Sequence, residues 1–297
     1  MIYINELDVL DMKITEFKDK LVLEQVADFD VGQTLECGQC FNFEKLKENE
    51  YVVLALGHLL HIKQVADTVT MFNTTLDEYE LIWKNYFDLD RDYGDIKRTL
   101  KEADELLVPA IDAKWGVHIL NQEFSENLMS FIISQTKQIT QIKQIVRMIS
   151  EKFGEFAGEI DGKKYYLFPE ISVLKNMTQQ DFLDCKTGFR APYLVNAAAF
   201  LTPEMNGEYF SSKTYEEAKK ELLSIKGVGE KVANCVLLFS LGYRNAFPVD
   251  VWIKRTMEDL YFHKDTRVDI IQKFGEERFG DLGGYAQQYL FYYGKSK

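Results

Sequence analysis

The chain has 297 residues, of which 46% are hydrophobic and 28% charged, so it can bury a core large enough for two or three packed subdomains. Its formal net charge of −12 argues against a nucleic acid partner, but the imbalance is mostly N-terminal, because residues 1–100 carry 20 acidic and 10 basic side chains. No apolar run approaches the ~20 residues that span a bilayer, which excludes a membrane protein.

The cysteines and the N-terminal residues limit the expected cofactors and location. Four cysteines (37, 40, 185 and 235) without a repeating spacing predict free thiols. Cys37 and Cys40 have metal-ligand spacing, but no second Cys or His pair follows nearby, so we expect no bound metal and no cofactor. The first residues alternate charged and apolar side chains, unlike a signal peptide, and we expect a cytoplasmic protein.

In chain order, the hydrophobic pattern predicts strands first and helices afterwards. Residues 51–73 alternate and break at Gly57 and near Asp67, which indicates an antiparallel meander. From Thr75 onward hydrophobes recur at helical spacing, with one or two buried-face helices over 125–153, a helix from about Thr178 and another after Gly188. The prediction is therefore an α+β protein, with a β-rich subdomain (1–105) packed on a larger α-helical region (106–297).

The most informative segment is a pair of helices joined by a tight turn, at about residues 215–242. The turn is Gly227-Val228-Gly229, whose glycines permit positive φ and whose amides can hold a phosphate. Most such turns only terminate a helix. Lys231 follows in the first turn of the second helix, where the positive end of the helix dipole disfavours an ammonium ion. A neutral amine there can act as a nucleophile, although a lysine at a helix start is usually a solvated surface residue.

Asp250, in the sequence FPVDVW, favours the interpretation of Lys231 as a nucleophile over that of a surface lysine. It follows Lys231 by one helix and a return loop, so both side chains can face one cavity. A carboxylate there can stabilise positive charge that develops on a sugar. Asp250 is also a candidate N-cap for the next helix, and the two roles are compatible.

At these residues the chain resembles the helix-hairpin-helix glycosylases, specifically the 8-oxoguanine DNA glycosylases, over nearly its whole length. Hairpin, lysine and Pro-Val-Asp occur in the family's order. Four further segments carry the resemblance: LECGQCFNF, MSFIISQ, KTGFRAPYLVNAAAFL and GGYAQQYLF. The resemblance implies a helix-hairpin-helix glycosylase fold for the α-helical region.

The resemblance also implies roles for individual residues. Lys231 would be the Schiff-base nucleophile and Asp250 the catalytic carboxylate, while the Gly38 carbonyl would accept the N7 hydrogen that only oxidised guanine carries. The expected contacts of the extruded base are Cys235, Gln287, Phe291 and Trp252. Expected DNA contacts are the wedge Phe189, Arg190 beside the orphaned base, the turn Gly227, Val228 and Gly229, and Thr136, Lys137 and Gln141 near the opposite base.

Four positions depart from the family pattern. Thr136, Lys137 and Gln141 stand where animal members carry asparagines and an arginine that hold the opposite cytosine, which predicts a relaxed opposite-base preference. Trp252 stands where those members have a histidine near the DNA backbone.

The sequence thus predicts a bifunctional DNA glycosylase/lyase that excises 8-oxoguanine from duplex DNA through a lysine imine. Two alternatives stay open: an alkylpurine DNA glycosylase, which has no use for Lys231, and a non-catalytic helix-hairpin-helix DNA-binding module. We expect a monomeric prokaryotic enzyme associated with the nucleoid through DNA. The resemblance also implies an ion held by the carbonyls of residues 227–229.

Overall fold

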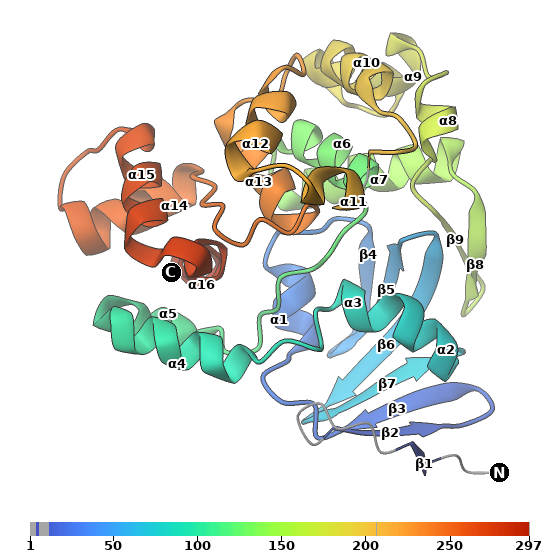
Figure 1. The fold of residues 1–297 in the computed structure, drawn as a ribbon. Coiled ribbons are helices and arrows are strands. Elements are labelled where there is room, and N and C mark those ends of the chain that lie inside the picture. Colours follow the sequence, from blue (N-terminus) through green and yellow to red (C-terminus); the bar gives the residue numbers. More distant parts are fainter. Residues whose placement is uncertain (1–3, 6–11, 206, 297) are drawn as a thin grey trace.

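The computed structural model describes residues 4–5, 12–205 and 207–296, and its elements follow the expected α+β order (Figure 1). The sequence analysis compared the first residues with a signal peptide, and most of these residues lie outside the described ranges. In the described part of the chain, seven strands form one antiparallel sheet in the order β1-β2-β3-β7-β6-β5-β4. These strands are β1 (Ile4–Asn5), β2 (Lys13–Glu16), β3 (Lys20–Glu24), β4 (Phe43–Lys47), β5 (Glu50–Ala55), β6 (His58–Val65) and β7 (Thr68–Phe72).

The meander predicted for 51–73 is confirmed as β5, β6 and β7. Leu60 and Ile62 of β6 and Val69 and Met71 of β7 are fully buried, and the residues between them are more exposed. This period of two places one face of the sheet against a core that includes Trp83. The sheet therefore carries its own apolar core.

Helices make up most of the chain after residue 75. They are α1 (Val31–Glu36), α2 (Leu76–Glu78), α3 (Lys84–Tyr86), α4 (Tyr93–Ala103), α5 (Val108–Ala113), α6 (Phe124–Ser134), α7 (Ile139–Phe153), α8 (Ile171–Leu174), α9 (Gln179–Asp184), α10 (Ala191–Phe200), α11 (Gly207–Ser211), α12 (Tyr215–Leu223), α13 (Glu230–Phe239), α14 (Val251–Met257), α15 (Val268–Phe279) and α16 (Gly283–Lys295). Short 3₁₀ turns (Glu105–Leu107, Gly188–Arg190, Gly280–Leu282) and π turns (Tyr79–Trp83, Glu258–Phe262) connect several of them.

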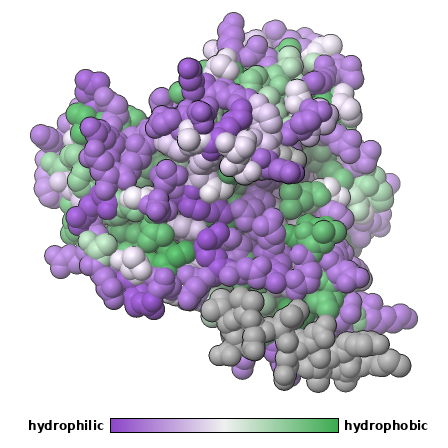
Figure 2. Space-filling view, viewed as in Figure 1, coloured by the Kyte–Doolittle hydropathy of each residue, from purple (hydrophilic) through white to green (hydrophobic). Residues whose placement is uncertain are grey.

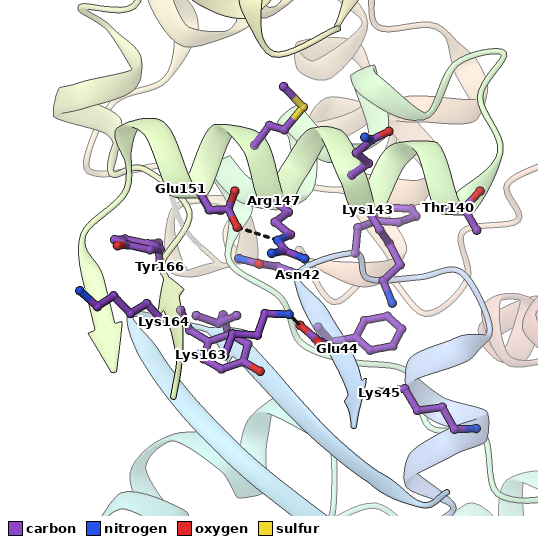
Figure 3. Close-up of a pocket in the computed structure, with 17 residues that line it drawn as sticks. Asn42, Glu44, Lys45, Thr140, Lys143, Arg147, Glu151, Lys163, Lys164 and Tyr166 are labelled. Carbon is purple, nitrogen blue, oxygen red and sulfur yellow. Dashed lines mark hydrogen bonds and ion pairs between the residues drawn. The ribbon is translucent and has the colours of Figure 1, made fainter. Parts of the chain in front are cut away.

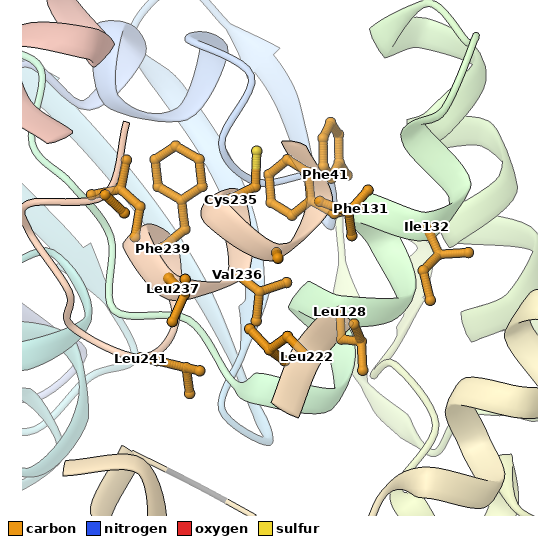
Figure 4. Packing of buried hydrophobic residues seen from close by; sticks show 14 of the residues in the cluster. Phe41, Leu128, Phe131, Ile132, Leu222, Cys235, Val236, Leu237, Phe239 and Leu241 are labelled. Atoms are coloured by element: carbon orange, nitrogen blue, oxygen red, sulfur yellow. The ribbon is translucent and has the colours of Figure 1, made fainter. Parts of the chain in front are cut away.

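Helix α13 lies at the centre of the helical part. Every residue from Val232 to Phe239 is buried, and α13 packs against α6 and α12. Phe131 of α6 stacks on Phe239 with ring centroids 5.7 Å apart, beside Cys235 (Figure 4). The same helical core includes residues of α4, such as Leu100, which the expected boundary at residue 105 groups with the sheet. The hairpin that joins α12 to α13 is thus anchored by the buried α13 on one side and by Ala218 and Leu222 of α12 on the other.

One β-hairpin interrupts the mostly helical part of the chain after residue 75, and the sequence analysis did not predict it. Strands β8 (Phe156–Ile160) and β9 (Lys163–Tyr166) form an antiparallel hairpin after α7. Asp161 and Gly162 join them with φ of 51° and 79°. Tyr165 of this hairpin packs on Val52 and Leu54 of the main sheet. The hairpin therefore links the helical region to the sheet.

The visible face of the molecule is mostly hydrophilic, with apolar patches between the polar side chains (Figure 2). Within the described ranges, no helix combines the length and the apolar character that crossing a bilayer requires.

Candidate active site

Six of the predicted site residues line one small cavity. Its volume is about 40 Å³, and its walls come from the loop after α1, from α6, α13 and α16, and from the loop before α14. The lining residues are Gly38, Phe131, Lys231, Cys235, Phe239, Pro248, Asp250, Gln287, Gln288 and Phe291. Segments more than 200 residues apart in sequence, such as those of Gly38 and Phe291, thus meet at Lys231.

Lys231 lies in the first turn of α13, whose N-cap is Gly229. Its Nζ donates a hydrogen bond to the Ser134 hydroxyl at 3.1 Å and lies 4.8 Å from the centroid of the Phe131 ring. None of the ion pairs within 4 Å among the described residues involves Lys231. The amine is therefore held by a neutral hydroxyl and an aromatic ring.

Cys235 stands one helical turn after Lys231 and lines the same cavity. Burial raises the pKa of the Cys235 thiol to about 11. The side chain is thus a neutral, polarisable surface in the cavity wall, suited to contact a flat base.

Asp250 combines the two roles that the sequence left compatible. It is the N-cap of α14, where its Oδ1 accepts a hydrogen bond from the Ile253 amide at 2.8 Å. That bond fixes the carboxylate, which also lines the cavity with Lys231. An N-cap side chain normally faces solvent. The position of Asp250 in the cavity wall therefore indicates a role in the reaction besides capping.

The C-terminal wall of the cavity presents unsatisfied polar atoms. Gln287 Nε2 donates to the Pro248 carbonyl at 3.1 Å, whereas its Oε1 is buried without a hydrogen-bond partner in the described structure. The Nε2 of Gln288 is in the same condition. Buried polar atoms are nearly always paired, so an acceptor and a donor left open here suit the polar edge of a base.

Gly38 is tightly enclosed beside Phe291. Its φ is +91°, and a Cβ built on it would lie 3.0 Å from Ile139 Cδ1 and 3.3 Å from Phe291 Cε1. A side chain at this position would strain the backbone and press on the ring. Glycine therefore allows the main chain at residue 38 to approach the cavity.

The turn before Lys231 is also tightly packed. Gly227 has φ of +96°, and a Cβ there would meet the Tyr193 side chain at 2.4 Å, whereas space is open around Gly229. Val228 is buried and anchors the turn in the core. The Gly227 carbonyl accepts a hydrogen bond from Gln135 Nε2 at 3.0 Å. The turn is thus rigid, and the free amides at the start of α13 lie beside it.

Phe189 and Arg190 are adjacent in the chain but differ in environment. Phe189 is 59% exposed, as a wedge requires. Arg190 is only 3% exposed, and its guanidinium donates to the carbonyls of Gln135 and Thr187 and to the Thr136 hydroxyl at 2.7 Å. In this structure Arg190 therefore braces the loop between α6 and α7, and its expected contact with the orphaned base stays a prediction.

The residues expected near the opposite base belong to that loop and to the start of α7. Thr136 is exposed with φ of +55°, and Lys137 is half-buried next to it. The exposed Gln141 accepts a hydrogen bond from the Gln138 amide at 3.2 Å and so caps α7. Thr136 and Gln141 thus already have partners within the chain.

Trp252 does not line the Lys231 cavity. It is 42% exposed and lines a separate pocket of about 170 Å³ with Arg255, Tyr293 and others. Its expected contact with the extruded base therefore stays a prediction. Helix α14 is fixed by the Asp250 cap and the buried Ile253.

Sequence reasoning missed several of the cavity residues. Ser134, which holds the Lys231 amine, lies 97 residues earlier in the chain, within the segment MSFIISQ that carried the resemblance. Phe131, Phe239 and Gln288 read as ordinary helix residues. The packing of α6 against α13 brings Phe131 and Phe239 together, and no local sequence pattern predicts this contact.

Comparisons with known proteins agree on the family. Residues 21–128 match the model of the 8-oxoguanine DNA glycosylase N-terminal domain, and residues 129–279 match that of the HhH-GPD superfamily of base excision DNA repair proteins. The structure is similar to that of the Clostridium acetobutylicum 8-oxoguanine glycosylase/lyase in complex with DNA that contains cytosine opposite 8-oxoguanine. The TM-score is 0.92 and the sequence identity 40%, over 97% of this chain and 99% of the other.

Two curated relatives are more distant. The N-glycosylase/DNA lyase OGG1 of Arabidopsis thaliana is 29% identical over 71% of this chain and 57% of its own length, so the chain spans less than two thirds of that relative. The DNA-3-methyladenine glycosylase of Bacillus subtilis is 29% identical over 79% of this chain and 84% of its own.

Proposed function

Because the chain belongs to the HhH-GPD superfamily of base excision DNA repair proteins, we propose that it excises 8-oxoguanine from duplex DNA and cleaves the strand, with Lys231 as nucleophile. The observation that carries this proposal is the cavity that joins Lys231 and Asp250 to the unsatisfied Gln287. A nucleophile, a carboxylate and a polar edge for a base occupy one space. A binding module has no need for this combination.

The reaction begins with extrusion of the damaged nucleotide into the cavity. The lone pair of the Lys231 amine attacks C1′, the C1′–N9 bond breaks, and the base leaves with the bonding electrons and takes up a proton. Asp250 lies where it stabilises the positive charge that develops on the sugar. Opening of the sugar ring then yields an imine between Lys231 and C1′.

Strand cleavage follows from the imine. The protonated imine acidifies the C2′ hydrogen, and loss of that proton expels the 3′ phosphate by β-elimination. Hydrolysis of the remaining imine restores the amine. These steps use the chain's own residues and water, with no redox cofactor.

Recognition of the oxidised base rests on Gly38, Gln287 and Phe291. The Gly38 carbonyl accepts the N7 hydrogen of 8-oxoguanine, and guanine places an acceptor at that atom. Gln287 pairs with the base edge, and Phe291 stacks on its face. With 8-oxoguanine a donor faces the carbonyl acceptor, whereas with guanine two acceptors face each other. In a site without water this difference changes the binding free energies of the two bases by a few kcal/mol.

The same contacts argue against an alkylpurine specificity, despite the similarity to the Bacillus subtilis enzyme. Removal of an alkylated base with a good leaving group needs a carboxylate and an activated water, and leaves no role for an amine in the cavity. Lys231 therefore favours the glycosylase/lyase.

Borohydride trapping tests the proposal. Reduction of the imine should give a covalent protein–DNA band on a duplex with one 8-oxoguanine, and Lys231→Gln should abolish it. Lys226→Gln, an exposed lysine of the same hairpin, is the matched control and should retain the band. Base release without a band would instead assign the attack to water activated by Asp250, and neither product would indicate a binding module.

The opposite-base preference is expected to be relaxed. Arg190, Thr136 and Gln141 make hydrogen bonds within the chain, which leaves Lys137 as the free polar side chain of this set. Similar excision rates opposite all four bases would support the proposal, and a strong bias toward cytosine would refute it.

We also propose an ion at the hairpin, and only main-chain carbonyl oxygens support this proposal. The carbonyls of Gly227 and Gly229 accept hydrogen bonds from Gln135 and Ala233, and each keeps a second lone pair that fits a cation. Such an ion would add positive charge beside a DNA phosphate.

We also propose that the enzyme acts as a monomer, because one chain supplies every cavity residue. Its DNA substrate and its similarity to the Clostridium protein support a place at the nucleoid, in the cytoplasm of a prokaryote.

A further inference from the structure

A second and larger pocket lies apart from the Lys231 cavity, with no lining residue in common. It has a volume of about 590 Å³, within the range of small-molecule sites. Strands β4 and β5, helix α7 and strand β9 form its walls (Figure 3). The pocket thus uses the β8–β9 hairpin that links the two parts of the fold.

The pocket is basic in an acidic protein. Its lining includes five cationic side chains and two carboxylates, whereas the whole chain has a net charge of −12. The cations are Lys45, Lys143, Arg147, Lys163 and Lys164, and the carboxylates are Glu44 and Glu151. Local charge of this sign favours an anionic ligand.

Both carboxylates are already paired. Arg147 Nε donates to Glu151 at 2.7 Å, and Lys163 pairs with Glu44 across the pocket (Figure 3). Neither carboxylate is therefore available to the remaining cations.

Lys45 pairs with Glu36 and Glu48, which lie outside the pocket lining. Among the described residues neither Lys143 nor the exposed Lys164 has an ion pair, and Lys143 is the partly buried one of the two. It reaches from α7 toward the strands, and its Nζ lies 3.5 Å from the centroid of the Phe43 ring (Figure 3). The ion pairs of the described residues do not include Lys143. Burial lowers the pKa of its ammonium group. A partly buried cation without a partner is costly, and a bound anion would remove that cost.

Polar and aromatic groups complete the wall. The hydroxyls of Ser150 and Tyr165 are buried, and neither has a hydrogen-bond partner within the described structure. Phe41, Phe43, Tyr165 and Tyr166 supply ring surface. A phosphate alone would fill little of this volume, and rings beside cations suit a ligand that joins an aromatic base to phosphate.

We propose that this pocket binds a nucleotide, either free or at the end of a DNA strand, with its phosphate against Lys143 and its base among the aromatic rings. Thr140 lines the pocket and directly precedes Gln141, one of the residues expected near DNA. The site is independent of the chemistry at Lys231.

Isothermal titration with ADP, adenosine and pyrophosphate tests the proposal on the full chain. We expect saturable binding of ADP at one site and much weaker binding of adenosine. Lys143→Gln should weaken ADP binding about tenfold, the usual size of a lost charge-assisted contact. Lys273→Gln, on the exposed face of α15, is the matched control and should bind ADP as the wild type does.

Further measurements separate this site from folding and from catalysis. Thermal melting reports whether Lys143→Gln folds, and the exposed Lys164→Gln at the same pocket provides a second variant. Borohydride trapping on the 8-oxoguanine duplex should be unchanged in both, so a failure of the glycosylase proposal would not be read as a failure of this one.

Competition identifies the source of the nucleotide. Displacement of ADP by a 5′-phosphorylated single strand, and not by the unphosphorylated strand, would assign the pocket to a DNA end; no displacement by either strand would assign it to a free nucleotide. The proposal is overturned if ADP shows no saturable binding up to about 10 mM, or if both lysine variants bind ADP with wild-type affinity.

Discussion

Replacement of Gly38 by alanine separates recognition of the base from the chemistry at Lys231. The new Cβ would lie 3.0 Å from Ile139 Cδ1 and 3.3 Å from Phe291 Cε1, at φ of +91°. An L-residue in this region costs about 1–2 kcal/mol, and the close contacts add about 1 kcal/mol or more. We expect the variant to fold with reduced stability and with the Phe291 ring displaced by a few tenths of an ångström.

The effect on activity follows from the contacts proposed between the base and Gly38 and Phe291. Loss of one hydrogen bond in a dry site costs about 1–3 kcal/mol, so base release should slow by roughly tenfold to hundredfold. Strand cleavage at a preformed abasic site bypasses base recognition and should stay close to the wild-type rate. Single-turnover assays on the two duplexes measure these rates separately.

Gly57→Ala is the matched control. Gly57 lies in the β5–β6 turn with φ of +79°, and nothing lies within 4 Å of an added Cβ. The control should therefore lose stability by about 1–2 kcal/mol and keep both activities. Wild-type base release by Gly38→Ala, or an equal loss of strand cleavage, would refute the reasoning.

Three further predictions concern the hairpin, a buried carboxyl and the wedge. Gly227→Ala should weaken DNA binding and destabilise the fold by about 2–4 kcal/mol, because the Cβ would overlap the Tyr193 ring; unchanged affinity in a DNA titration would contradict this. Burial raises the pKa of Glu126 to about 8, so the folded state binds this proton more tightly than the unfolded state does. The resulting stability is full below about pH 4.5 and is lost as pH rises through about 8, whereas Glu126→Gln should remove this slope of a few kcal/mol in urea titrations; equal slopes would exclude it. Phe189→Ala should slow excision with stability changed by less than about 0.5 kcal/mol, whereas Arg190→Lys should cost about 1–3 kcal/mol of unfolding free energy; the reverse order would contradict the burial of Arg190.

The residues proposed for catalysis could be found from the sequence because they lie at fixed positions in local motifs. Lys231 begins a helix after a glycine turn, and Asp250 caps the helix that follows Pro248. The spacing of 287 and 291 on one helix places both side chains on the same face. These features depend on short segments, and the structure brings them to one cavity.

The parts that sequence did not predict depend on distant partners. Arg190 is buried because a carbonyl 55 residues earlier accepts its hydrogen bonds. The pocket that Trp252 lines depends on how α14 packs, and the sequence of this seven-residue helix does not define its packing. The β8–β9 hairpin is different, since Asp161-Gly162 between two alternating runs is a usable hairpin signal that the helical reading of this region passed over.

The small size of the Lys231 cavity has a consequence for how the protein meets free ligands. A volume of about 40 Å³ holds a few water molecules and no purine, so Phe291 and its neighbours must move before a base enters. Only the fraction of molecules with an open cavity is competent to bind, and the apparent affinity for a free base falls by that fraction. A base delivered on DNA arrives at high effective concentration and tolerates this loss, so the small cavity discriminates against free bases in favour of a base held by DNA.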